Sequence, residues 1–260
     1  MIGCAGVGLH SGARVGLTLC PAAEDTGIRF RRVDRHRAAP IPARLDHVSS
    51  SDHATSLGPA SGGVRMIEHL MAAFAACEID NVLVEISGPE LPIMDGSALP
   101  FVLLMECAGI VEQDRPAPLL ELLRPVRVYS DRGTAALEPA DGCELVVTGP
   151  RGGRPFALHF SPDRCKSELV AARDDACRHG GGDRFADEPA RHAALDALAD
   201  LALMPARLKG RFVQTGTDSL LRRDLLRRLL ADRQCWRLTG GLRPTPAWTG
   251  AIVAAPAYAC

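Results

Sequence analysis

The chain has 260 residues, enough for one large domain or two small ones with a sizeable buried core. Its formal net charge of -1, with 23% charged residues, argues against a nucleic-acid partner or a charged membrane surface. Nine cysteines without a CxxC motif, and a beginning that is unlike a signal peptide, lead us to expect a cytoplasmic protein with reduced thiols and no transmembrane segment.

The first half predicts strands and helices separated by glycine-rich and proline-rich turns. Strands are expected at 14–19, 27–33 and 82–86, helices at 67–77 and 101–109, and loops at 6–12, 49–63 and 89–100. A linker is expected at 114–118, where two prolines follow two charged residues. We therefore expect one domain at 1–115 and a second at 119–260.

The second half repeats the order of strands followed by helices. Strands are expected at 125–129, 134–138, 144–148 and 156–160, and helices at 189–204 and 221–230. Leucines form the apolar stripe of the last helix, so we expect its arginines (Arg222, Arg223, Arg227 and Arg228) on a solvated face. An α+β pattern that occurs twice is the fold class predicted.

Two segments carry residue types suited to metal chemistry. Glu68 and His69 are adjacent at the start of an apolar helix, and His192 and Asp196 are four residues apart on another. Residues at i and i+4 share a helical face. Two His and one Asp are a three-ligand zinc set with an open fourth position, and Glu68 is placed to take a proton from a zinc-bound water.

Each of these residues also has a structural interpretation. Glu68 can offset a helix dipole, and His192 with Asp196 can be an exposed i,i+4 pair. Asp95 is expected to form a turn. Ser219 precedes a helix and fits an N-cap better than a catalytic role. His10, His159 and His179 are further imidazoles without supporting spacing.

Several motifs resemble the UDP-3-O-acyl-N-acetylglucosamine deacetylases, zinc amidases of lipid A biosynthesis. The resemblance rests on residues 6–12, 68–73, 79–81 and 89–102, and in the second half on Arg191-His192 with Leu195-Asp196 and Asp200-Leu201. It covers nearly the whole chain, tightly over 6–110. It implies two similar α+β domains, each with helices packed on a small mixed sheet, and a zinc site between the facing helix layers.

The resemblance also implies roles for individual residues. Zinc would be bound by His69, His192 and Asp196, and Glu68 would be the general base. Asp200, one turn beyond Asp196, matches an Asp that orients the family's catalytic His. The implied substrate is a UDP-linked acylated amino sugar, and we expect a monomer that binds no nucleic acid.

The chain departs from the family pattern around the expected oxyanion. Ser219 stands where the family has its catalytic His, and Ala193 where it has a Lys. The family's Arg-Thr-Phe stretch matches Arg173-Asp174-Asp175, and several dozen family residues that build the acyl tunnel are missing before Phe185. The family's first strand is expected to be cut short before Gly6.

Two functional hypotheses follow. The first is zinc-dependent deacetylation of UDP-3-O-acyl-N-acetylglucosamine through a water activated by Glu68, with low activity. The second is a catalytically impaired paralogue that keeps the zinc and binds a sugar nucleotide or a regulatory partner.

Overall fold

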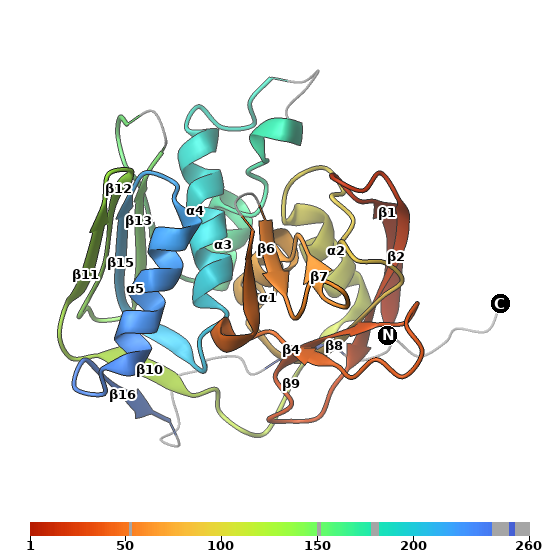
Figure 1. Ribbon diagram of the computed structural model, residues 1–260. Helices are drawn as coiled ribbons and strands as arrows, with labels where there is room; N and C mark the ends of the chain where they lie inside the picture. The colour runs from red at the N-terminus through yellow and green to blue at the C-terminus, as the bar shows by residue number, and fades with distance from the viewer. Residues whose placement is uncertain (52–53, 150–151, 178–181, 241–249, 253–260) are drawn as a thin grey trace.

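The computed structural model describes residues 1–51, 54–149, 152–177, 182–240 and 250–252. Within these residues the fold is α+β, with α-helices packed between two mixed sheets (Figure 1). The α-helices are α1 (Glu68–Ala76), α2 (Leu99–Ala108), α3 (Pro162–Glu168), α4 (Glu188–Leu201) and α5 (Ser219–Ala231). No helix among the described residues is long and apolar enough to cross a membrane.

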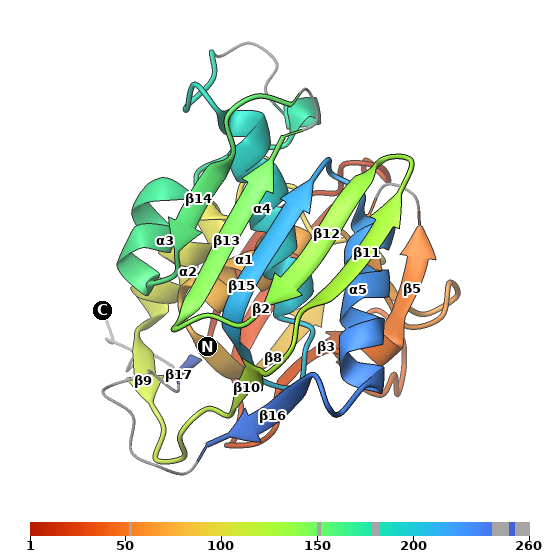
Figure 2. The same ribbon diagram turned by 90° about the vertical axis from the view of Figure 1, so that its left-hand side faces the viewer.

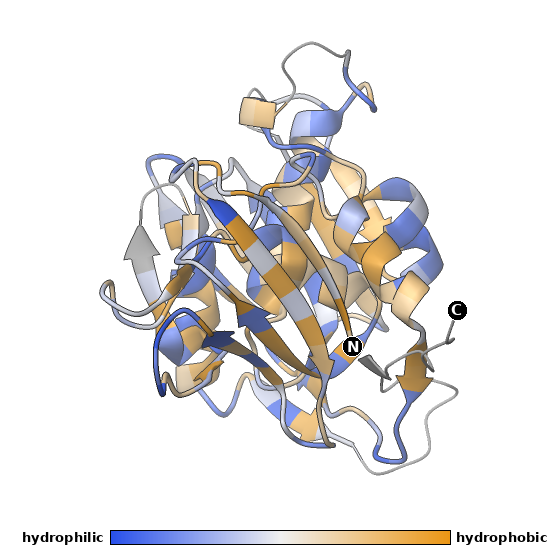
Figure 3. Cartoon of the chain, turned by 90° about the vertical axis from the view of Figure 1, so that its right-hand side faces the viewer, coloured by the Kyte–Doolittle hydropathy of each residue, from blue (hydrophilic) through white to orange (hydrophobic). Residues whose placement is uncertain are grey.

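The first sheet is built around β8 (Ile79–Ile86). Antiparallel β2 (Arg14–Pro21) and parallel β3 (Ile28–Arg32) both pair with it. The sheet is completed by β1 (Ile2–Val7), β4 (Ile41–Pro42), β9 (Ile110–Glu112) and β17 (Gly250–Ile252). Figure 3 views this sheet, whose long strands alternate between hydrophobic and hydrophilic residues as expected for strands with one buried face.

The second sheet is built around β15 (Arg207–Thr215). It runs antiparallel to β12 (Gly133–Glu138) and parallel to β13 (Cys143–Thr148) and β10 (Leu119–Leu122). The outer strands are β11 (Val126–Ser130), β14 (Phe156–His159) and β16 (Trp236–Thr239). In Figure 2 this sheet faces the viewer and the helices lie behind it.

A small third sheet contradicts the loop expected at 49–63. It consists of β5 (Val48–Ser51), β6 (Ala54–Leu57) and β7 (Val64–Arg65). All four residues of β6 are buried, and the strand lies close to the start of α1. Residues 49–63 are rich in serine and glycine and show no alternation of apolar and polar residues, so their sequence did not predict these strands. Short 3-10 helices occur at Leu45–His47 and Asp175–Cys177.

Most other expected elements are present, and two kinds of error stand out. The strand pattern was expected to begin at residue 14, but β1 precedes it and pairs with β2 from Ile2 to Val7. In addition, β10, β15 and α3 were missed. The proposed division into domains at 1–115 and 119–260 stays a prediction. β17 belongs to the second of these ranges, but it pairs with β8 and β9 of the first sheet.

Candidate metal centre

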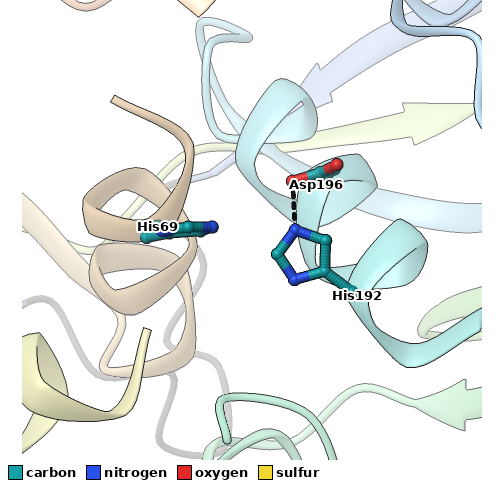
Figure 4. Close-up of side chains that lie close together, drawn as sticks. All are labelled: His69, His192 and Asp196. Carbon is teal, nitrogen blue, oxygen red and sulfur yellow. Dashed lines mark ion pairs between the residues drawn. The ribbon is translucent and has the colours of Figure 1, made fainter. Parts of the chain in front are cut away.

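The candidate site lies where α1 and α4 pack against each other. His69 comes from the first turn of α1, and His192 and Asp196 come from one face of α4 (Figure 4). One ligand atom from each of these three residues lies within 4.8 Å of the others. The two imidazole rings are 5.2 Å apart between centroids, at an interplanar angle of 73°. The structure thus brings together the three residues that sequence spacing had grouped.

Small side chains allow the two helices to approach. Ala72, Ala73 and Ala76 of α1 are buried, as are Ala193 and Ala197 of α4. Leu70 and Met71 continue α1 into the hydrophobic core. Because burial of these apolar faces fixes both helices, the candidate ligand side chains are held on rigid elements.

His192 is oriented by a backbone carbonyl. Its Nδ1 lies 3.3 Å from the carbonyl oxygen of Ala172, which can only accept a hydrogen bond. Nδ1 therefore carries a proton, and Nε2 faces the carboxylates of Asp196 and Asp174. This arrangement is typical of metal-binding histidines, whose second nitrogen donates to a carbonyl or carboxylate.

The charges in the site are strongly coupled. Burial opposes protonation of His192, but Asp196 and Asp174 outweigh it and raise its pKa to about 9. Burial and then the neighbouring His192 lower the pKa of His69 to about 3. The two carboxylates therefore favour a positive charge at His192, whereas His69 stays neutral and offers a ring nitrogen.

Glu68 directly precedes His69 in the chain, and one of its carboxylate oxygens has no hydrogen-bond partner among the described residues. Its Oε1 accepts a hydrogen bond from the backbone N–H of Thr55 on β6. Its Oε2 is buried and has no hydrogen-bond partner among the described residues. Burial, reinforced by the charge of Asp196, raises the pKa of Glu68 to about 7. A carboxyl group with such a pKa suits proton transfer near neutral pH.

Asp200 has arginine partners that sequence reasoning missed. Arg222 Nε lies 2.7 Å from Asp200 Oδ2, and Arg223 Nε lies 3.6 Å from Asp200 Oδ1. Arg222 and Arg223 are 3% and 1% exposed, so the solvated face expected for them was wrong, whereas Arg227 and Arg228 are exposed. Arg223 also donates to the hydroxyl of Thr55 at 2.8 Å.

Ser219 is the first residue of α5. The N-cap is its neighbour Asp218, whose carboxylate accepts hydrogen bonds from the backbone N–H groups of Leu220 and Leu221. No hydrogen bond of the Ser219 hydroxyl occurs among the described residues.

His159, on β14, is 73% exposed and faces Glu144. His10 lies in a turn held by the buried carboxylate of Glu90, and His179 lies outside the described residues.

The segment before α4 is anchored by buried charges. Glu188, fully buried in the first turn of α4, accepts hydrogen bonds from Arg173 and from the backbone N–H of Arg184. Arg184 in turn contacts Asp95 at 2.8 Å. Asp95 also bonds the N–H and hydroxyl of Ser97, so it forms the expected turn and an additional link between the two halves.

A cavity lies away from this site. It has a volume of about 740 Å³ and is lined from both halves of the chain, with Phe74, Asn81, Leu198 and Arg207 among its walls. None of Glu68, His69, His192, Asp196 and Asp200 lines it. The candidate site is therefore defined by its side chains and not by cavity size.

The fold and the site define an α+β protein whose facing helices gather two imidazoles and a carboxylate suited to one divalent metal ion. A family model, LpxC: UDP-3-O-acyl N-acetylglycosamine deacetylase, matches residues 1–174. The chain belongs to this deacetylase family.

Curated relatives agree over most of the chain. A UDP-3-O-acyl-N-acetylglucosamine deacetylase of Methylococcus capsulatus is 34% identical, with 92% of this chain and 90% of that protein covered. That of Myxococcus xanthus is 36% identical, with 92% and 87% covered. That of Stenotrophomonas maltophilia is 35% identical, with 89% and 88% covered.

Proposed function

We propose that this protein is a zinc-dependent amide hydrolase that removes the acetyl group from UDP-3-O-acyl-N-acetylglucosamine in lipid A biosynthesis. The observation that carries the proposal is the convergence of His69, His192 and Asp196 beside an unpartnered oxygen of Glu68. Family membership and the names of the relatives support the substrate.

The donor set fits zinc. Two histidines and one carboxylate are among the common ligand sets of catalytic zinc, and the Nδ1 hydrogen bond of His192 leaves its Nε2 available. When bound, zinc supplies a Lewis acid for the amide carbonyl and lowers the pKa of a water molecule.

The residues of the chain then move the proton. The free Oε2 of Glu68 accepts a proton from the attacking water while Thr55 holds its Oε1 in place. Because Ser219 cannot supply a protonated imidazole, Glu68 must return that proton to the departing amine. Asp200 acts as a positioning residue, holding Arg222 close to the carboxylate of Asp196.

A second candidate function is a catalytically impaired member of the family that keeps the metal and binds a sugar nucleotide or a regulatory partner. Two observations favour it. Ser219 replaces an acid, and Asp174 places a carboxylate within 3.6 Å of His192, near the expected position of the oxyanion. Loss of a catalytic acid typically costs roughly 10²–10⁴ in rate.

Metal analysis of the purified protein combined with an assay of acetate release from the UDP-linked substrate tests both functions. Zinc with Glu68-dependent acetate release supports the enzyme. Zinc with substrate binding but no acetate release supports the second function, and a protein that binds neither zinc nor substrate refutes both.

A further inference from the structure

Asp174 lies at the edge of the metal centre, in the segment just before α4. Its Oδ2 is 3.6 Å from Nε2 of His192, and Oδ1 of Asp196 is 3.7 Å from the same nitrogen. Two carboxylates therefore approach one imidazole nitrogen at nearly equal distances. Asp174 stands outside the cluster formed by His69, His192 and Asp196.

The backbone around Asp174 fixes its carboxylate. Oδ1 accepts a hydrogen bond from the N–H of Ala176 at 2.7 Å, at the start of the short 3-10 helix. The N–H of Asp174 donates to the carbonyl of Gly96 at 2.8 Å. With one oxygen held by the backbone, the other is presented to His192.

The distances suit a shared cation better than direct hydrogen bonds. A hydrogen bond between a charged nitrogen and a carboxylate normally measures about 2.7–2.9 Å, and both contacts here are longer. Ligands bonded tetrahedrally to one zinc ion at about 2.0–2.1 Å lie roughly 3.3 Å apart. Asp174 does not belong to the group of ligand atoms that lie within 4.8 Å of one another, so its side chain would have to move for Oδ2 to reach the same ion as the other three residues.

We propose that Asp174 is a fourth protein ligand of the metal. The inference rests on the metal site of the proposed function. It changes a three-ligand site with an open position into a closed site with two histidines and two aspartates. The position that a reacting water needs is then taken by Asp174 in the resting protein, and Asp174 must leave before the substrate can react.

Cobalt(II) titration of the natural chain, Asp174→Ala and Asp174→Asn tests the inference without an activity assay. Asn keeps an oxygen for the N–H of Ala176, so this variant preserves the turn. Asp175→Asn is the matched control, since Asp175 is an exposed carboxylate of the same 3-10 helix. Visible absorption reports the coordination of the cobalt, and azide serves as the probe for an open position.

We expect cobalt to bind about tenfold or more weakly to both Asp174 variants and unchanged to the control. Azide should alter the cobalt spectrum of the Asp174 variants and leave that of the natural chain unchanged. Equal affinities and equal azide responses overturn the role of Asp174 while the metal site stands. Absence of stoichiometric cobalt in the natural chain refutes the metal site and the inference together.

Discussion

The guanidinium group of Arg222 lies 2.7 Å from the carboxylate of Asp200, and both side chains are nearly inaccessible to water. Burial works against the charged form of Arg222, but Asp200 and Asp196 raise its pKa. The partner of Asp200 is therefore a permanent cation on α5 and not an imidazole. This pair joins α4 to α5 one helical turn beyond Asp196.

Removing Asp200 should destabilise the protein strongly. Asp200→Ala leaves the buried Arg222 and Arg223 without their carboxylate, and loss of one partner of a buried ion pair costs about 3–5 kcal/mol. Urea unfolding measures the change in free energy. The control is Asp224→Ala, which breaks the exposed pair with Arg228 and should cost less than about 1 kcal/mol. Similar losses for the two variants would show that the buried pair contributes no special stability.

Metal binding should depend on both helices. We expect one zinc ion per chain, lost on His69→Ala or Asp196→Ala, because each change removes a ligand from the cluster. Metal content after dialysis measures the loss. His159→Ala changes an exposed histidine outside the site and should keep the zinc. Stoichiometric zinc in the doubly substituted His69→Ala, Asp196→Ala protein would place the metal elsewhere.

Glu68→Gln should separate catalysis from metal binding. The amide oxygen of Gln can still accept the hydrogen bond from Thr55, but it cannot take up a proton. We expect kcat to fall by about 10²–10⁴ with zinc content unchanged. Residual turnover that is insensitive to this change would rule out Glu68 as the base.

Ser219 predicts slow turnover in the natural protein. A hydroxyl group cannot supply the cationic hydrogen-bond donor that a protonated His offers to an oxyanion. Ser219→His is expected to raise kcat, and more so when Arg222→Gln releases Asp200 to pair with the new imidazole. Steady-state kinetics of the single and double variants check this. A natural chain as fast as its relatives would mean that another residue provides the acid.

The short segment before α4 predicts weak discrimination among acyl chains. Only the residues from Asp174 to Asp187 connect the Arg173 region to α4, too few to build a long apolar tunnel in the way the resemblance implies. Binding of substrate analogues with acyl chains of different length, measured by calorimetry, should vary little. Nanomolar affinity for a long-tailed inhibitor would show that other residues form a passage.

Helical spacing predicted that His192 and Asp196 share one face of a helix, whereas the residue types and the family resemblance joined them to His69 on another helix. His192 and Asp196 are one helical turn apart, and His69 begins a strongly apolar helix. The burial of Arg222 and Arg223 was not predictable in this way, since their partner Asp200 belongs to a different helix. β15 was missed because Gly210 and Gln214 interrupt its apolar face, although both are buried in the sheet. The roles of the site residues, the monomeric state and the cytoplasmic location stay predictions.

Thr55 makes the early and late parts of the chain depend on each other. Its N–H holds Glu68, while its hydroxyl accepts a hydrogen bond from Arg223 near the end of the described fold. A chain truncated before α5 would retain Glu68 and the three candidate ligands. It would lose Arg223, the cation that donates a hydrogen bond to Thr55 on the strand that holds Glu68. The strand that holds Glu68, the candidate base, is therefore itself supported by a side chain of α5 that lies 168 positions further along the chain.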